Sequence, residues 1–366
     1  MTQARTRLER TPHQYVRRGD ARVVTERLLG DWLVNFLYAH AREHTGTLFR
    51  ALTSPRVSKL LAYANFDSAL TARLVGHRRF LRACRVNLRE CLDPPESFDT
   101  PRQLFERKIR YWECRPMADD PDAVLSPADA RVLIGSFRSG SPLFIKGKFF
   151  EFEELLGRNK TTWLNAFRDG DWAICRLTPD RYHYNHTPVA GEVVDFYQIP
   201  GGYHACNPGA VVELVTPYSK NKRVVTVIQT DVPGGTRIGL VAMIEVVALM
   251  IGAVVQCYSA ERYDAPQLVR TGLCVRKGVP KSLYRPGSST DVLVFQRDRV
   301  TFADDLVRNL SRAGVHSRFS LGFGTPLVET DVKVRSPIAR RAVKEGGSRW
   351  KTYFSSWRSE RAPHYS

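Results

Sequence analysis

The spacing of apolar residues divides the chain into two parts. From about residue 21 to residue 112 the period is helical, with Leu28, Trp32 and Phe36 on one stripe. A second helical stretch, at 67–86, interleaves apolar residues with arginines. A third begins at Thr100 and Pro101, a capping residue followed by a proline at the first helical position. These patterns predict a helical, basic N-terminal region.

After the linker-like segment PMADDPDA the pattern changes to short β-rich runs separated by Gly, Pro, Asn and Asp. The runs are RVLIGSF, PLFIKGKFFEF, WAICRL, GEVVDFYQI, AVVELV, RVVTVIQ and DVLVFQ. One short helix is expected in ADDLVRNLSRAG, which ends in a glycine. The pattern therefore predicts an α+β protein in which a β-rich domain follows the amphipathic helical region.

The longest apolar run, at 241–258, is interrupted by Glu245 and Gln256. It is shorter than the ~20 apolar residues that a bilayer-spanning helix needs. Because it is rich in β-branched residues, it predicts two buried strands joined by a turn and no transmembrane span.

Charge and cysteine content narrow the class of partner and the compartment. The chain has 55 Lys+Arg against 37 Asp+Glu, a net charge of +18, which favours nucleic acid, an acidic protein or an anionic membrane as partner. Its 7 cysteines are scattered and include no C-x-x-C pair, which argues against a disulfide framework and fits a reducing compartment. The arginine-rich start has no apolar core, so no secretory signal is expected.

Three short segments carry residue types that catalysis uses. RYHYNHTP contains His183 and His186, SPADA contains Asp129, and a Gly-Ser-Ser-Thr turn contains Ser288 and Ser289. A histidine base, an orienting carboxylate and an activated hydroxyl form a nucleophile set. Taken singly, each segment also has an ordinary structural interpretation as a loop, a turn or a buried histidine pair. No cysteine pair or HExxH accompanies the histidines, so no metal site is expected.

In their order, these segments resemble the phosphatidylserine decarboxylase proenzyme family. The resemblance runs from about residue 105 to residue 326, through DPDAVLSPADARV, IKGKFFEFEELLG, LTPDRYHYNHTPVAGEV, VRKG and the GSST turn before DVLVF. It implies a self-processing enzyme with a pyruvoyl group made from an internal serine, which converts phosphatidylserine to phosphatidylethanolamine and CO2. The implied domains are a membrane-docking region at 1–115, a decarboxylase domain at 116–330 and a basic aromatic tail at 331–366.

The resemblance also assigns roles to the candidate residues. It implies that His186 activates the serine, that Asp129 orients His186, and that His183 protonates the carbanion left by CO2. Counting forward from VRKG places the nucleophile at Ser288, after Gly287, and counting back from the strand places it at Ser289. We favour Ser288, with cleavage between residues 287 and 288, because glycine allows the strained turn that an acyl shift needs.

The chain differs from the family's sequence motifs at four positions near these residues. Pro280 and Ser282 stand where the family has an acidic residue and a glycine, and Asp291 stands where an apolar residue begins the strand. Ala130 replaces the glycine of SPADG. These departures leave the Asp, His, His and Ser set intact.

The resemblance implies an anionic phospholipid membrane as partner, with the protein peripheral on the cytoplasmic side of the cell membrane. Homodimers are common in the family, and amphipathic helices with flanking arginines suit a membrane surface. Two other functions stay open: a related decarboxylase of a soluble amino acid, and an inactive basic protein that binds membrane or nucleic acid. No nucleic-acid-binding motif supports the last, so no nucleic acid is expected.

Overall fold

The computed structural model describes residues 11–26, 81, 86–141, 149–204, 206, 208–213, 216–248, 253–286 and 289–343. Most of the first two predicted amphipathic helices, the Gly287–Ser288 pair and the tail from residue 344 lie outside these described residues. Among the helices that are described, none is long and apolar enough to cross a membrane.

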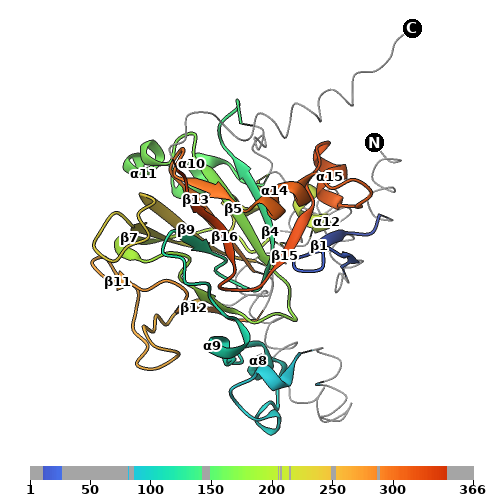
Figure 1. Ribbon diagram of the computed structural model, residues 1–366, viewed down its shortest axis with the longest axis vertical. Coiled ribbons are helices and arrows are strands. Elements are labelled where there is room, and N and C mark those ends of the chain that lie inside the picture. The colour runs from blue at the N-terminus through green and yellow to red at the C-terminus, as the bar shows by residue number, and fades with distance from the viewer. Residues whose placement is uncertain are drawn as a thin grey trace.

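A ten-stranded sheet forms the body of the molecule (Figure 1). Its order is β11-β7-β8-β9-β13-β5-β4-β15-β1-β2. The strands are β1 (Gln14–Arg17), β2 (Val23–Thr25), β4 (Ala130–Ser136), β5 (Asp171–Leu177), β7 (Gly191–Ile199), β8 (Arg223–Gln229), β9 (Leu240–Val247), β11 (Cys274–Val275), β13 (Ser289–Phe295) and β15 (Glu329–Val332). Neighbours are antiparallel except for β1, which lies parallel to β15.

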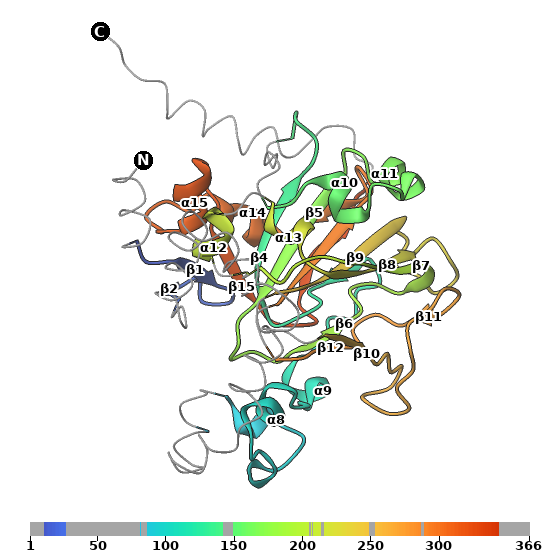
Figure 2. The same cartoon turned by 180° about the vertical axis from the view of Figure 1, so that it is seen from behind.

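Two three-stranded sheets complete the β structure. One has the order β10-β12-β6 and the other β14-β16-β3. Their strands are β3 (Ala123–Leu125), β6 (Tyr184–His186), β10 (Val254–Gln256), β12 (Pro280–Tyr284), β14 (Val300–Phe302) and β16 (Pro337–Arg341). Both views place β12 between the large sheet and the short helices α8 and α9 (Figures 1 and 2). This sheet therefore separates the body from the helical end of the molecule.

The helices are short, and the ones other than α8 and α9 lie around the large sheet (Figure 2). Helices α12, α14 and α15 gather near β1, whereas α10 and α11 lie near the far end of β5 (Figure 2). The helices are α8 (Pro101–Phe105), α9 (Tyr111–Cys114), α10 (Phe152–Leu156), α11 (Thr161–Ala166), α12 (Pro208–Glu213), α13 (Pro217–Lys220), α14 (Asp304–Leu310) and α15 (Arg318–Phe323), with 3-10 turns at Leu88–Glu90 and Pro95–Ser97.

The main hydrophobic core is built from both faces of the large sheet. Strands β5, β9 and β13 at its centre are buried along nearly their whole length, as their apolar runs predict. Close packing fixes Gly135 on β4, because an added Cβ there would lie 2.1 Å from the ring of Trp172. A separate cluster of six buried residues surrounds β6: Ile109, Tyr111, Tyr182, Tyr184, Leu283 and Val334.

The structure confirms the α+β class and most of the predicted elements. Strands β4, β5, β7, β8 and β13 coincide with predicted runs, and the run at 241–258 forms β9 and β10 with undescribed residues between them. Helix α14 forms as predicted, and α8 begins at Pro101 with a full capping box from Thr100.

Four predictions of local structure are wrong. AVVELV belongs largely to helix α12, Val23–Thr25 is a strand and not the start of a helix, and the third helix ends at Phe105, before Ile109. The predicted tail begins too early, because β15 and β16 pair with β4 and β3. Residues up to 341 therefore belong to the β-rich body.

Candidate active site

Ser289 is the first residue of β13 and sits between two strands of the large sheet. Its backbone pairs with Leu177 at the end of β5 and with Val247 at the end of β9. The side chain is fully buried, and its Oγ has no hydrogen-bond partner among the described residues. A buried hydroxyl without a partner costs free energy and is often explained by chemistry or by a missing ligand.

His186 lies on β6 with both ring nitrogens engaged. Nδ1 is 3.0 Å from the carbonyl oxygen of Gly278, which can only accept, so Nδ1 carries the proton. Nε2 is 2.9 Å from the hydroxyl of Tyr182 and therefore accepts from it. Gly278 has a φ of +75°, a left-handed conformation that favours glycine. The turn thus fixes the tautomer of His186 and leaves Nε2 as its basic atom.

His183 has the same tautomer but a free basic nitrogen. Its Nδ1 lies 2.8 Å from the carbonyl oxygen of Arg181, while its Nε2 is buried without a partner among the described residues. The ring stacks on Phe105 of α8 with centroids 3.5 Å apart. Tyr284 links this histidine to the serine strand: its amide donates to the carbonyl of His183, and its hydroxyl is 3.0 Å from the carbonyl oxygen of Thr290.

Both histidines are neutral at ordinary pH. Burial is the main cause that lowers the pKa of His183 to about 3, and the charge of Arg107 adds to it. Burial likewise lowers the pKa of His186 to about 3. At neutral pH each imidazole is therefore a proton acceptor at Nε2, and it can return a proton only after taking one up.

Asp129 binds partners other than His186. The Nε and Nη2 atoms of Arg115 donate to its two carboxylate oxygens over 2.9 and 2.7 Å, and the amide of Val334 donates over 2.8 Å. Burial alone would raise the pKa of Asp129, but the bonds and charge of Arg115 outweigh it and lower the pKa. Within the described residues no hydrogen bond joins Asp129 to His186, and the carbonyl of Gly278 occupies the orienting position expected for Asp129.

A buried polar cluster beside Ser289 was not identified as functional from the sequence. It consists of Asn185, Glu245, Lys281, Ser282, Tyr284 and Asp291, which come from β6, β9, β12 and β13 and are all fully or almost fully buried. The sequence did contain signs of this cluster: Glu245 interrupts an apolar run, and Ser282 and Asp291 differ from the family's motif. Sequence alone could not show that these positions meet, because they lie on strands far apart in the chain.

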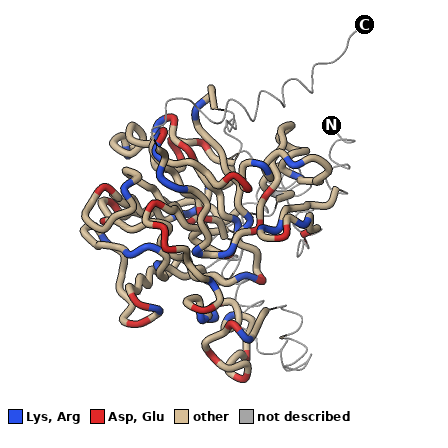
Figure 3. The backbone as a smooth tube through the Cα atoms, in the orientation of Figure 1, with Lys and Arg blue, Asp and Glu red and all other residues tan. Residues whose placement is uncertain are grey.

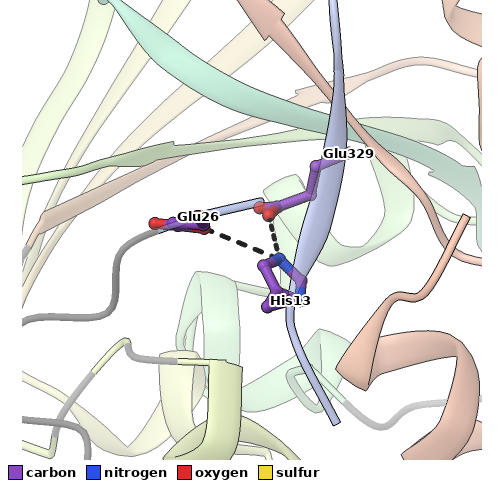
Figure 4. Close-up of side chains that lie close together, drawn as sticks. All are labelled: His13, Glu26 and Glu329. Carbon is purple, nitrogen blue, oxygen red and sulfur yellow. Dashed lines mark hydrogen bonds and ion pairs between the residues drawn. The ribbon is translucent and has the colours of Figure 1, made fainter. Parts of the chain in front are cut away.

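His13, Glu26 and Glu329 form the cluster in the described part of the chain that most resembles a metal site (Figure 4). Nδ1 of His13 accepts the amide of Arg318, so Nε2 holds the proton and donates to Glu329 over 2.7 Å. Arg176 pairs with both carboxylates. With the imidazole donating and the single charge of Arg176 shared by the two carboxylates, the group is an ion-pair cluster that fastens the N-terminal strands to β5 and β15.

Comparisons with known proteins show which family the chain belongs to. The chain is 25% identical over 313 residues to a phosphatidylserine decarboxylase proenzyme of Fusobacterium nucleatum, covering 84% of this chain and 95% of that protein. It is 28% identical over 320 residues to the proenzyme of Chlamydia trachomatis, with the same coverage. Proenzyme 2 of Oryza sativa is 33% identical over 233 residues, 63% of this chain and 34% of that protein. The family model described as phosphatidylserine decarboxylase matches residues 102–317, which include every candidate residue, and the chain therefore belongs to this family.

Proposed function

We propose that this protein is a self-processing, pyruvoyl-dependent carboxy-lyase that converts phosphatidylserine to phosphatidylethanolamine and CO2. Family membership supports the reaction, and the relatives it matches are named as proenzymes. The observation that carries the proposal is Ser289. A buried hydroxyl without a partner among the described residues, at the first residue of a central strand, fits a serine that is consumed to make the pyruvoyl group.

We propose Ser289, and not Ser288, as the nucleophile. Ser288 and Gly287 lie outside the described residues, so this choice rests on the burial of Ser289 and on its Oγ, which has no partner in the described part of the chain. The sequence alone favours Ser288 because a glycine, Gly287, precedes it. Cleavage between residues 288 and 289 would leave β13 at the start of the new chain.

The cleavage balances as an acyl shift followed by an elimination. Oγ of Ser289 attacks the carbonyl carbon of residue 288, the peptide C–N bond breaks, and an ester forms while the hydroxyl proton moves through a base to the new amine. Loss of the α-proton then breaks the ester C–O bond, which releases the carboxylate of residue 288 and leaves dehydroalanine. Water hydrolyses this residue to the pyruvoyl group and ammonia.

His186 and His183 have complementary capacities in this scheme. We assign His186 as the base for the serine, because Nδ1 holds the ring proton and Nε2, which exchanges its bond from the Tyr182 hydroxyl for the serine proton, is the basic atom. We assign His183 to proton transfer during decarboxylation. Because its Nε2 is neutral and free, it first takes a proton from the substrate's ammonium group and then returns it to the carbanion. The pyruvoyl group supplies an electron sink for the pair left by CO2.

An arginine-lined hollow supports a membrane surface as the place of action. It lies between β1 and α14 and is lined by Arg17, Arg18, Gly19, Ala21, Asp305, Arg308, Asn309 and Arg312. Arg17 and Arg18 are paired with aspartates, whereas Arg308 and Arg312 have no ion pair with any described residue. Elsewhere in the described part, basic and acidic residues are interspersed (Figure 3). We propose that this hollow faces anionic lipid on the cytoplasmic side of the cell membrane.

Intact-mass analysis of the purified protein tests the self-processing. We expect two chains, 1–288 and 289–366, the second lighter than a serine-ended fragment by the mass of one ammonia. Ser289→Ala should stay uncleaved, while Ser288→Ala should still be cut. A wild-type protein that remains a single chain would refute self-processing, and a cut abolished only by Ser288→Ala would move the nucleophile to Ser288.

Vesicle assays separate the lipid substrate from a soluble amino acid. We expect release of CO2 from phosphatidylserine vesicles and sedimentation with them. Arg308→Glu should weaken binding to the vesicles about 30-fold, since each basic residue near the surface contributes on the order of 1 kcal/mol, the reversal counts twice, and about 2 kcal/mol is a factor of about 30. Arg270→Glu, an exposed charge reversal before β11, is the matched control. Release of CO2 only from a free amino acid would overturn the lipid assignment.

A further inference from the structure

Ser282 and Asp291, two residues at which the chain differs from the family's motif, both lie beside the buried carboxylate of Glu245. The hydroxyl of Ser282 donates to Oε1 of Glu245. Asp291 lies directly opposite Glu245 in the register of β13 and β9, where side chains on one face are in contact. Asp291 is also two residues after Ser289 and so lies on the same face of β13. The serine therefore shares a buried face with two carboxyl groups.

Glu245 is fully satisfied by its own partners. Oε1 accepts from Asn185 and Ser282, and Oε2 accepts from Gln256 and, over 2.7 Å, from Lys281. The single positive charge of Lys281 thus matches the single negative charge of Glu245. A second carboxylate in the same place would have no counter-ion, and such a charge is costly to bury.

Asp291 and the carbonyl of Thr290 both lie within hydrogen-bond distance of the single hydroxyl of Tyr284. The Tyr284 hydroxyl lies 3.0 Å from the carbonyl oxygen of Thr290 and 2.8 Å from Oδ1 of Asp291. A phenol has one proton for these two acceptors. Both contacts become hydrogen bonds if Asp291 donates its own proton to Tyr284, which then donates to Thr290. The other oxygen, Oδ2, is buried with no partner among the described residues.

We propose that Asp291 is a further positioning residue of the processing site, acting as a neutral carboxylic acid. Its proton completes a chain from Asp291 through Tyr284 to the carbonyl of Thr290, the residue after the nucleophile. The chain fixes the start of β13 while Ser289 reacts. Loss of the proton turns the Tyr284 hydroxyl toward Asp291 and places a second negative charge opposite Glu245. The role rests on the proposed self-processing.

The surrounding groups agree with this state. The titratable residues facing Asp291 are Cys175 on β5, Glu245 on β9, and Lys281 and Tyr284 on β12. Burial, followed by the charge of Glu245, raises the pKa of Asp291 well above its usual range, against smaller opposing effects of Tyr284 and Lys281. Burial also raises the pKa of Cys175, which keeps the thiol neutral.

Infrared spectroscopy tests the protonation without any enzyme activity. The uncleaved Ser289→Ala variant should show the C=O stretch of a protonated carboxylic acid at neutral pH. That band should disappear in the double variant that also carries Asp291→Asn. If Asp291→Asn does not fold, Asp291→Val, which restores the residue type of the family, should lose the same band. An unchanged spectrum in the folded variant would overturn the proposal, and this holds even if the wild-type chain never processes.

The pH profile of self-cleavage tests the positioning role. In the wild-type protein the cleavage rate should fall about tenfold per pH unit above the pKa of Asp291. Asp291→Asn cannot ionise and should keep its rate over that range. Asp171→Asn is the matched control, because Asp171 is a second carboxyl on this sheet whose pKa is raised by burial, far from Ser289. An Asp291→Asn profile that overlays the wild type would refute the role.

Discussion

Replacing Asp129 with asparagine separates a structural role of this carboxylate from a catalytic one. In the family's scheme the aspartate orients a histidine, so its loss should affect chemistry and leave folding intact. The contacts observed here point elsewhere, because Asp129 accepts two bonds from Arg115 and one from the amide of Val334. We therefore expect Asp129→Asn to destabilise the fold.

The magnitude follows from burial. The side chains of Arg115 and Asp129 are 6% and 4% exposed, so the variant leaves a guanidinium that is almost fully buried facing an amide. Breaking one partner of a buried pair costs about 3–5 kcal/mol. Glu90, 2.9 Å from Arg115 and 21% exposed, recovers only part of this loss. At roughly 2–4 °C per kcal/mol for a large domain, the melting temperature should fall by about 10 °C.

Thermal unfolding by circular dichroism on the uncleaved Ser289→Ala background measures this change on one intact chain. Glu90→Gln is the control, because loss of the more exposed partner should cost only about 1 kcal/mol. The reasoning is refuted if Asp129→Asn melts with its parent while the serine-bearing Asp129→Asn chain fails to process. Asp129 would then act on the histidines and not through Arg115.

Three further outcomes are expected. Acid should unfold the protein. Histidine in the unfolded chain titrates near pH 6.5, whereas burial lowers the pKa of His183 and His186 to about 3 in the folded protein. Between these two pH values the unfolded state therefore binds more protons than the folded state. The free energy of unfolding should then fall by up to about 2.7 kcal/mol per pH unit, and urea titrations at pH 7 and pH 5 with the same midpoint would contradict this. Arg176→Met should destabilise by about 3–5 kcal/mol in the same titration, because it leaves the buried carboxylate of Glu329 without its arginine. Chelators and added zinc should not change the melting temperature, since Nε2 of His13 already carries a proton; a zinc-dependent rise would show a metal site.

Much of the fold could be predicted from the sequence where the pattern is local. Strands β5, β8 and β13 contain runs of apolar and β-branched residues, and the Thr100–Pro101 cap starts α8. Helix α12 could not be predicted, because its valines favour strands. Packing overrides that preference: Val212 lies against Gly322 of α15, where an added Cβ would be 2.1 Å from it.

The candidate site was predictable as a set of residues but not as a geometry. The histidine segment and the serine turn are local motifs, and the structure joins His183 to the serine strand through Tyr284. Which atom orients His186 depended on a carbonyl 92 positions away, at Gly278. The polar cluster around Glu245 likewise arises from the register of β9 against β13, which no local pattern specifies.

The strand order of the large sheet imposes a sequence of events on maturation. In the proposed product 289–366, β13 is enclosed by β9 and β5, β15 by β4 and β1, and β16 bonds to β3, all from the longer product. The strands of the two proposed products therefore alternate within the same sheets, so the products cannot fold separately and then associate. The intact chain has to fold first and be cut afterwards, so the precursor serves as the only template for assembly of its own subunits. A protein cut at the proposed site and then unfolded would have to interleave two separate chains to refold.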